Sequence, residues 1–406
     1  MPLFERFDDQ LSLSKKIVIG IQHTFTMFGA TVLVPVLTGM DVSVALFMAG
    51  AGTLFFHLIT KGAVPVFLGS SFAFIAPIIA VAEAHGMAYA QGGVVVAGLV
   101  YLLAAALVRC FGAQRVVSFF PPVVTGPIIL IIGLTLAPTA VGSASENWLL
   151  AVISFLIVAG VSVFTRRFIQ VLPVLCGLLG GYLAALIMGK VDFAPFAQAQ
   201  WVGIPPFTLA KFNVDAVMTI GFVSIATMVE HIGDVAAIGA TCDKNFMKNP
   251  GLHRTLLGDG LATSISAFFG GPANTTYSEN TGVLALTRVY NPAVMRIAAC
   301  FAILLGVIPK LGAFIRTIPN AVIGGISIVL FGMIASIGAR TLVENRVDFK
   351  KPRNLLISAV ILVLGLGGTK LPLTIGSVKL TVSSLALAAI AGIILNKALP
   401  AGDAGQ

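Results

Sequence analysis

Charged residues are scarce in this sequence. Only 10% of its 406 residues are Asp, Glu, Lys or Arg, and 57% are hydrophobic, whereas soluble domains average about 25% charged residues. A soluble domain of this composition would lack a polar surface, which excludes a soluble globular protein. Apolar runs of about 17–25 residues, long enough to cross the hydrocarbon of a bilayer, recur between Ile17 and Leu399. We therefore expect a chain embedded in membrane lipid.

Groups that usually carry catalysis are also missing. The four cysteines, Cys110, Cys176, Cys242 and Cys300, lack the spacing of metal ligands and are expected to be small core residues. The sequence shows no nucleotide-binding glycine loop, no catalytic triad and no cluster of metal ligands. We therefore expect neither an enzyme nor a metal site.

The apolar runs predict fourteen membrane-spanning helices, and hence an all-α polytopic membrane protein. The expected ranges are 17–38, 43–60, 66–82, 92–112, 122–138, 147–165, 171–189, 214–238, 255–269, 278–290, 293–309, 320–338, 353–367 and 380–398. An even number of spans places both termini on the same side of the membrane.

The basic residues indicate which side is cytoplasmic. With a cytoplasmic N-terminus, six of the 25 basic residues fall on the outer side, which leaves 25 − 6 = 19 on the cytoplasmic side. Cytoplasmic loops of membrane proteins carry such an excess. We therefore predict cytoplasmic termini, and because topology accounts for most of the net charge of +9, no nucleic-acid partner is expected. The six outer residues are Lys190, Lys211, Lys310, Arg316, Lys370 and Lys379.

Two similar stretches suggest an internal repeat. Pro121–Ile128 in the fifth span and Pro319–Ile326 in the twelfth both follow the pattern P-x-x-V-x-G-x-I. Because they lie an odd number of helices apart, they enter the membrane from opposite sides, as in an inverted repeat. The sequence predicts seven plus seven spans, with residues 14–189 as the first repeat and 212–400 as the second. The longest polar connection, 189–215, lies where the two repeats should join.

Residues that interrupt helices occur in the third and tenth spans. The third reads VFLGSSFAFIAP from Val66 to Pro77, and GGPANTTYSENTGVLALTR runs from Gly270 to Arg288 around the tenth. Non-helical backbone at membrane depth must be buried in protein or line a cavity. A matched pair of such segments is typical of a transporter with its substrate site at the middle of the membrane. The alternative is a kinked or re-entrant helix without a ligand.

Four acidic residues lie inside predicted spans: Glu230, Asp234, Asp259 and Glu279. Each would cost at least about 2.5–3.5 kcal/mol at a helix centre, so each should face the protein interior. Glu230 and Asp234 share one face of the eighth helix because they are four residues apart. We expect Glu230 and Glu279 to be functional. For Asp259 we expect bonds to neighbouring backbone or hydroxyl groups, and for His231 a backbone carbonyl partner rather than a proton relay.

These stretches resemble the nucleobase:cation symporters of the nucleobase/ascorbate transporter family, and within it the bacterial members that carry uracil. The resemblance covers essentially the whole chain. Its family signature is complete at Glu279, Asn280, Gly282, Thr287 and Arg288. The other matching stretches are QHTFTMFGATVLVP in the first helix, LGSSFAFIAP in the third, EHIGD in the eighth and GLATSISAFFGGPANTTYSENTGVLALTRV through the ninth and tenth.

The resemblance implies a fold and a function. It implies fourteen spans arranged as a core domain (spans 1–4 and 8–11) and a gate domain (spans 5–7 and 12–14), with short β-strands in spans 3 and 10. It further implies proton-coupled uptake of uracil across the bacterial inner membrane, by alternating access of core against gate. The expected partners are uracil, H⁺, membrane lipid and a second copy of the chain, joined through the gate. Protons are the coupling ion, and no other cofactor is expected.

The resemblance also implies roles for the carboxylates. Glu230 would bind the N–H groups of the pyrimidine ring, and Glu279 would lie at the site and take part in proton coupling. Glu230 and Asp234 are the other candidates for the coupled proton. At the position of Asp234 uracil-type members can carry His and purine-type members more often an acid, which leaves a xanthine or purine permease of the same family as an alternative.

The remaining site residues are apolar or act through their backbone. By the same resemblance, Phe72 would stack on the base, and backbone amides around Ala30, Tyr277 and Ser278 would meet its carbonyl groups. Phe331 occupies a gate position that can be Tyr, so a hydroxyl contact would be missing here.

The chemistry of uracil agrees with these residue types. Uracil is planar and neutral, with two N–H donors and two carbonyl acceptors, so it requires an acceptor-only carboxylate, backbone donors and a flat apolar wall. Desolvation makes the charged form of a carboxylate costly, so buried carboxylates can also bind and release protons. A sulfate-type anion transporter is a weaker alternative, because two carboxylates would repel an anion. A passive channel is the remaining alternative.

Overall fold

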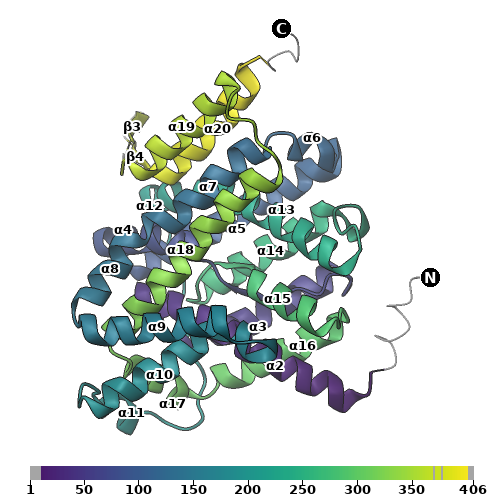
Figure 1. Ribbon diagram of the computed structural model, residues 1–406. Helices are drawn as coiled ribbons and strands as arrows, with labels where there is room; N and C mark the ends of the chain where they lie inside the picture. Colours follow the sequence, from purple (N-terminus) through teal and green to yellow (C-terminus); the bar gives the residue numbers. More distant parts are fainter. Residues whose placement is uncertain (1–10, 369–370, 376–377, 401–406) are drawn as a thin grey trace.

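The computed structural model describes residues 11–368, 371–375 and 378–400, which form a bundle of helices with a small two-stranded sheet buried inside it (Figure 1). Polar interruptions divide several of the apolar runs into shorter pieces. The elements of the first half are α2 (Leu13–Thr38), α3 (Val42–Ile59), β1 (Leu68–Ser70), the 3₁₀ turn η1 (Phe72–Phe74), α4 (Ile75–His85), α5 (Met87–Phe111), α6 (Ala113–Val117), α7 (Pro122–Thr135), α8 (Ala137–Ser145), α9 (Trp148–Phe164), η2 (Arg167–Val171), α10 (Pro173–Ile187) and α11 (Ala194–Gln198).

The second half begins after the polar connection that the sequence predicts. Its elements are α12 (Val214–Gly221), α13 (Val223–Cys242), η3 (Met247–Gly251), α14 (Leu252–Phe268), β2 (Asn274–Thr276), α15 (Ser278–Thr287), α16 (Pro292–Gly306), α17 (Pro309–Arg316), α18 (Asn320–Glu344), α19 (Pro352–Leu366), β3 (Leu371–Ile375), β4 (Val378–Val382) and α20 (Ser384–Ala398).

Helix ends follow local sequence signals. Gly39 ends α2 in the left-handed conformation, with φ 79°, which glycine adopts without steric cost. Asp41 then caps α3, because its Oδ1 accepts from the backbone N–H groups of Ser43 and Val44 at 2.8 and 3.1 Å. Extended Pro121 and Pro319 immediately precede α7 and α18. The two P-x-x-V-x-G-x-I stretches therefore occupy the same position at the start of their helices.

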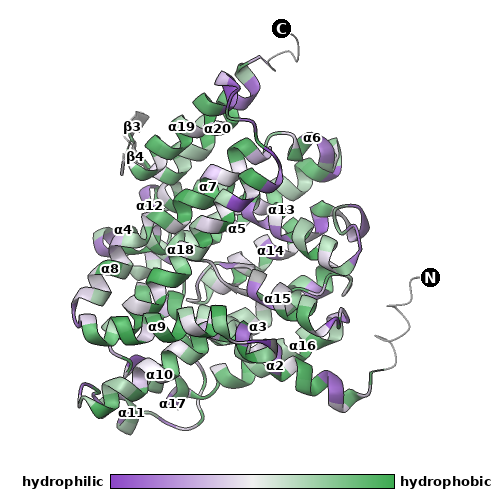
Figure 2. Ribbon diagram, viewed as in Figure 1, coloured by the Kyte–Doolittle hydropathy of each residue, from purple (hydrophilic) through white to green (hydrophobic). Residues whose placement is uncertain are grey.

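The described residues include six helices that are long and apolar enough to cross a membrane, or seven if the bent pair α16–α17 is one span. Five shorter apolar helices of 10–17 residues accompany them, and hydrophobic residues dominate most helices in Figure 2. The protein is thus a mostly helical, polytopic integral membrane protein. Because breaks shorten several spans below the length of a full crossing, the count of fourteen stays a prediction.

Several predicted helix ranges are wrong in detail. The range 66–82 begins as strand β1, and 380–398 begins with the last residues of β4, with α20 starting only at Ser384. The short strands predicted in spans 3 and 10 are present as β1 and β2, whereas the β3–β4 hairpin was not expected. The range 293–309 corresponds to α16, which a bend of 78° separates from α17. The range 214–238 corresponds to α12 and α13, which together form one apolar stretch, Val214–Cys242, long enough to cross a membrane. Apolar periodicity does not distinguish a continuous span from one that is bent or broken.

Helices from distant parts of the sequence pack closely through glycines. A Cβ added at Gly98 of α5 would meet the backbone of α14, one at Gly50 of α3 the backbone of α16, and one at Gly133 of α7 the backbone of α18. Small residues allow such close approach of helices in membranes. Replacing any of these glycines with a residue that has a Cβ atom would force the helices apart.

The contacts divide the helices into two groups. One group contains α2, α3, α4, α5, α12, α13, α14, α15 and α16, and the other contains α7, α8, α9, α10, α18, α19 and α20. The groups meet where α10 contacts α2 and where α7 and α20 contact α13. The two-stranded sheet belongs to the first group, since β1 contacts α2 and α3, and β2 contacts α13 and α14.

The cysteines follow the sequence prediction only in part. Cys242 is buried, as expected of a small core residue. Cys176 is half-buried, and Cys110 and Cys300 are exposed, so the core assignment is wrong for these last two. Hydrophobic residues on the outer surface of a membrane protein can face lipid, which explains why their apolar character does not indicate burial in the protein.

Candidate functional site

The two interrupted segments meet as antiparallel strands. Leu68 pairs with Thr276, Gly69 with Thr275 and Ser70 with Asn274, and all six residues except Gly69 carry side chains that are buried. The pairing continues at both ends, since Ser71 N–H donates to the carbonyl of residue 273 at 2.9 Å and the amide of residue 277 to that of residue 67 at 3.1 Å. The backbone that leaves the helical conformation here is thus satisfied by strand pairing.

A proline in α2 connects this helix to the sheet. Pro35 has no N–H, so the carbonyl of Thr31, four residues earlier, lacks its usual helical donor. Ser70 Oγ of β1 donates to that carbonyl at 3.0 Å. The hydroxyl of Tyr277 in turn donates to the carbonyl of Ser70 at 3.0 Å. The ring of Tyr277 lies directly against Gly69, where a Cβ would collide with it.

Phe72 follows the first strand and reaches the second helix group. It is buried, and its ring meets the ring of Phe331 of α18 edge to face, with centroids 6.0 Å apart and an interplanar angle of 70°. Edge-to-face aromatic pairs at this separation are favourable. The structure therefore brings together the predicted stacking residue and the predicted gate residue.

The predicted carboxylates lie on the helices beside the sheet. Glu230 is half-buried on α13, and Asp234 is half-buried one turn later. Glu230 Oε2 is itself buried and has no hydrogen-bond partner within the described part of the chain. Glu279 is half-buried in the first turn of α15, where the positive end of the helix dipole favours a carboxylate. Glu230 lies within electrostatic reach of both Glu279 and Asp259.

A small cavity of about 50 Å³ adjoins Glu279 at the boundary of the two helix groups. Ala30 of α2, Glu279 of α15 and Leu330 of α18 line it, together with residues 171–175 at the start of α10. Its volume holds a few water molecules. A second cavity, of about 510 Å³, is larger but remote from the predicted residues: it opens between α3, α11 and α17, beside the ion pair of Asp41 with Arg316.

Two of the three predicted backbone donors are already used. Ala30 lies in the middle of α2, so its N–H belongs to the hydrogen bonds of the helix. The N–H of Tyr277 donates to the carbonyl of Phe67 at 3.1 Å. The backbone of Ser278 starts α15, and N–H groups in a first helical turn have no partner within the helix. The start of α15 is therefore the part of this site best suited to donate to a ligand carbonyl.

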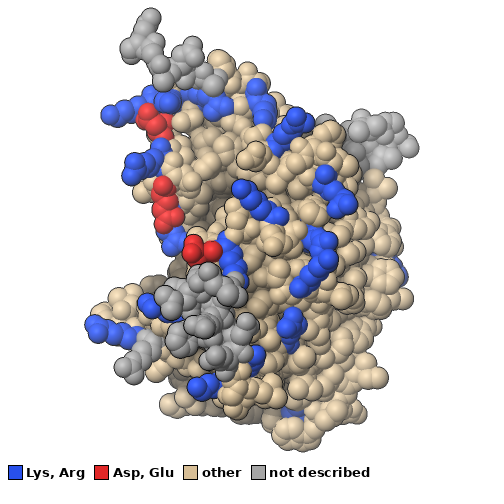
Figure 3. Space-filling view, turned by 90° about the vertical axis from the view of Figure 1, so that its right-hand side faces the viewer, with Lys and Arg blue, Asp and Glu red and all other residues tan. Residues whose placement is uncertain are grey.

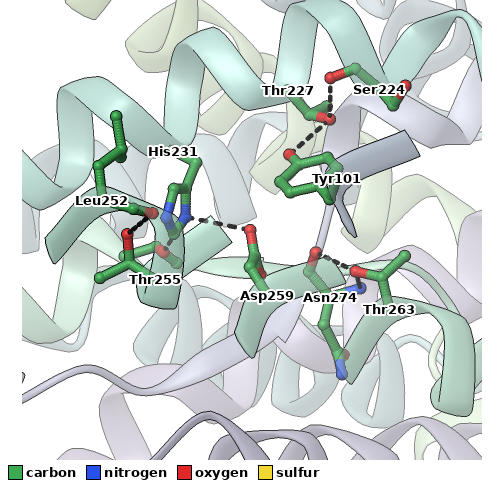
Figure 4. A network of polar contacts seen from close by, with 10 residues as sticks. Tyr101, Ser224, Thr227, His231, Leu252, Thr255, Asp259, Thr263 and Asn274 are labelled. Atoms are coloured by element: carbon green, nitrogen blue, oxygen red, sulfur yellow. Dashed lines mark hydrogen bonds and ion pairs between the residues drawn. The ribbon is translucent and has the colours of Figure 1, made fainter. Parts of the chain in front are cut away.

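His231 and Asp259 correct two of the sequence expectations. His231 Nδ1 lies 3.1 Å from Asp259 Oδ2 and 3.1 Å from Thr276 Oγ1, so neither a backbone carbonyl for the histidine nor backbone or hydroxyl groups for the carboxylate is the observed partner. Figure 4 shows the two side chains pointing toward each other, with the Tyr101 hydroxyl directed to Thr227. The buried carboxylate pairs with the nearest basic side chain, which single-residue reasoning could not identify.

Sequence reasoning also missed a second polar pair. Asn280 Nδ2 of α15 donates to His23 Nδ1 at 3.0 Å and to the carbonyl of His23 at 3.2 Å, and both side chains are buried. The pair joins α2 to the first turn of α15, directly after Glu279. A signal existed, because His23 lies inside a long apolar run and buried polar groups require partners.

Comparison with known proteins shows the family. Residues 14–374 match a model described as the Permease family. The chain is 45% identical over 400 residues to the uracil permease of Bacillus subtilis (strain 168), covering 94% of this chain and 92% of that protein. It is 42% identical over 409 residues to the putative pyrimidine permease RutG of Escherichia coli (strain K12), covering 97% and 91%.

Solved structures show the same fold at low sequence identity. The transmembrane domain of the cyanobacterial bicarbonate transporter BicA superposes with a TM-score of 0.65 at 17% identity, covering 93% of this chain and 97% of that one. The murine Slc26a9 anion transporter in the inward-facing state gives 0.67 at 11% identity, covering 95% and 68%. The protein is a transporter and not an enzyme, and the chain belongs to the permease family of nucleobase/ascorbate transporters.

Proposed function

We propose that this protein takes up uracil together with protons. The observation that carries the proposal is Glu230 Oε2, a buried acceptor to which no described residue donates. Buried polar atoms are nearly always paired, so an unpaired carboxylate oxygen beside the strand pair is suited to a ligand's donor. The relatives named uracil permease, at up to 45% identity, support a pyrimidine base as this ligand.

The proposed binding mode assigns one task to each element. Glu230 of α13 accepts from the N–H groups of uracil, since a carboxylate accepts but does not donate. Phe72 supplies the flat wall, and the N–H group of Ser278, at the start of α15, donates to a carbonyl of the base. The boundary of the site is formed by Ala30, Tyr277 and Phe331. Tyr277 fixes the strand pair through its bond to Ser70, and Phe331 supports the ring of Phe72.

Glu279 is the proposed carrier of the coupled proton. It lies in the first turn of α15, lines the small cavity and is within electrostatic reach of Glu230. Protonation of Glu279 removes a negative charge from the moving part of the protein, which lowers the cost of carrying the site through the membrane. Glu230 and Asp234 remain members of the same coupled set, in which protons belong to the group rather than to one residue.

Transport is proposed to occur by movement of a core domain against a gate domain. The core comprises predicted spans 1–4 and 8–11, and the gate comprises spans 5–7 and 12–14; together they form two inverted repeats, 14–189 and 212–400, of fourteen spans. The division of helix contacts into two groups supports this assignment. So does the cavity at the boundary between these groups, which Ala30 and Glu279 line from one side and Leu330 from the other.

The proposed location is the bacterial inner membrane, with both termini in the cytoplasm. Lys and Arg side chains are spread over the face shown in Figure 3, with a few Asp and Glu along one edge, which suits a cytoplasmic surface. We also propose a homodimer that forms through the gate, with lipid surrounding the remaining apolar surface.

Uptake into proteoliposomes tests the function. Purified protein should concentrate labelled uracil when the pH gradient is directed inward, and an uncoupler should abolish the accumulation. Unlabelled uracil should compete, whereas xanthine and sulfate should not. Competition by xanthine would favour a purine permease, competition by sulfate an anion transporter, and equilibration without accumulation a channel, and each result would contradict the proposal.

A further inference from the structure

The pair formed by His231 and Asp259 has no task in the proposed uptake of uracil. Both side chains are fully buried, with their Nδ1 and Oδ2 atoms 3.1 Å apart. Both carboxylate oxygens of Asp259 and the Nε2 of His231 lack a hydrogen-bond partner in the described part of the chain. The Nδ1 of His231 bonds to Thr276 Oγ1, so its contact with Asp259 is an ion pair. A carboxylate and an imidazole that are both fully buried raise the question of which charges they carry.

Glycines place Asp259 where water is excluded. Gly258 and Gly260 flank it on α14. A Cβ added at Gly258 would press on Phe56 of α3, and one at Gly260 would press on Tyr101 of α5. These close approaches allow the two neighbouring helices to enclose the carboxylate. An ionised carboxylate in such a place is costly unless a partner compensates its charge.

The groups that face the pair add negative rather than positive charge. Glu230 and Asp234 lie on the same helix as His231, and Glu279 of α15 is within electrostatic reach of Glu230. The edge of the Tyr101 ring faces His231 at a centroid distance of 6.3 Å, but its hydroxyl donates to Thr227 and is not available to Asp259. Among these neighbours, His231 is the group able to compensate Asp259.

The pair is also positioned to affect the site. His231 follows Glu230 directly in α13, and its Nδ1 contacts Thr276 of β2, three residues before Glu279. The pair thus joins α13, which carries Glu230, to α14 and to β2, the strand that precedes α15 and Glu279. Its charge therefore acts on Glu230 over a short distance in surroundings that screen charges weakly.

We propose that His231 and Asp259 together bind one proton that stays in the protein during transport and cancels the charge of Asp259. With this resident proton the pair carries no net charge, and Glu230 keeps its own negative charge for the substrate. Without it, an ionised Asp259 would repel the charge on Glu230 and favour a protonated Glu230, which accepts hydrogen bonds less well. The inference rests on the proposed function for the role of Glu230, but the proton site itself does not.

The first test therefore does not use uracil. His231→Gln keeps a side chain that can bond to Asp259 and Thr276 but cannot take the proton. The buried Asp259 must then either stay ionised or take up a proton from solvent. The melting temperature of this variant in detergent should fall more steeply with rising pH than that of the parent. The double variant His231→Gln/Asp259→Asn has no such charge and should regain the parent's shallow dependence. Parallel curves for His231→Gln and the parent would overturn the proton site.

The second test measures uracil binding against pH. In His231→Gln, binding should be lost on acidification at a pH about one unit or more above that of the parent, because a nearby like charge shifts protonation by that order. The double variant should return to the parent's midpoint. Tyr101→Phe, which removes only the bond to Thr227, should leave the midpoint unchanged. Weaker binding by the same factor at every pH would show a merely structural role and overturn the effect on Glu230.

If the parent binds no uracil at any pH, the proposed function fails, while the melting curves still decide the proton site. If the parent binds uracil and its melting curve matches that of His231→Gln, the proton site fails and the proposed function stands.

Discussion

The two interrupted segments differ in what they bring to the same sheet. The first, β1 with η1 and α4, continues into the apolar rings of Phe72 and Phe74, and both are buried. The second, β2 with α15, carries the polar run from Asn274 to Asn280, with Glu279 inside it. Pairing satisfies the backbone of both segments equally. The side chains are therefore not needed to satisfy the backbone. Those of the first segment form an apolar wall, and those of the second form a polar surface.

This difference explains why the site needs both segments. A planar base with polar edges requires a ring against its face and hydrogen-bonding groups at its edges, and neither segment offers both. Glu230 completes the arrangement from α13, which contacts η1, β2 and α15. The predictions below disturb the junction, then each side of the site, in order of the expected loss of uracil binding.

The largest effect is expected where the two segments touch. Gly69→Ala would place a methyl group against the ring of Tyr277, which is buried and held by its bond to Ser70. Overpacking of this kind costs typically about 1–3 kcal/mol, so we expect a lower melting temperature and loss of uracil binding. Gly160→Ala on α9 is the matched control, since nothing lies within 4 Å of the added atom, and it should behave like the parent.

Glu230→Gln should lose most of the binding and all uptake. The amide keeps the shape but replaces a charged acceptor with a group that also donates, and a hydrogen bond to a charged group is worth about 1.5–3 kcal/mol. This corresponds to a loss of affinity of roughly 10- to 150-fold. Equilibrium binding of labelled uracil measures it, and parental affinity would remove Glu230 from contact with the base.

Phe72→Ala should weaken uracil binding by about 1–3 kcal/mol, because stacking on an aromatic ring contributes about this much per base. Phe72→Tyr should bind within a few-fold of the parent if the hydroxyl finds space beside Phe331. The same binding assay distinguishes the two variants. Normal binding by Phe72→Ala would mean that another residue forms the wall.

Asp234→Asn should have a small effect on affinity. Asp234 lies one turn beyond Glu230 on α13, so we expect uracil selectivity to persist while the rate of uptake decreases. Competition by a panel of unlabelled pyrimidines and purines checks this. A switch to purine uptake would show that Asp234 contacts the base directly.

The sequence predicted which segments lie together in the candidate site better than it predicted their geometry. The polar residues near Phe72 and Glu279 stand out because the rest of the chain is apolar, and helix interruption at membrane depth has few physical explanations. The hydrogen bond from Ser70 to the Thr31 carbonyl, which Pro35 leaves without its helical donor, was by contrast not predicted. Such a contact between residues far apart in sequence leaves no local pattern.

The partners of buried polar groups could likewise not be predicted from the sequence. His231 and Asp259 are 28 residues apart (259 − 231) on different helices, and each could have bonded to nearby backbone instead. The amide of Tyr277, expected to serve the base, donates to Phe67 because the strand pairing extends one residue further. Local composition predicts which residues need partners, whereas packing decides which partner each one has.

The central claim is that Glu279, on the polar segment, handles the proton while the rest of the site binds the base. Accumulation and exchange of labelled uracil by Glu279→Gln proteoliposomes test it most directly, because the amide mimics the protonated carboxylate. We predict that this variant binds uracil with nearly parental affinity and weak pH dependence, exchanges it across the membrane, and fails to concentrate it on an inward pH gradient. Accumulation equal to that of the parent would contradict the account and place the coupled proton on Glu230 or Asp234.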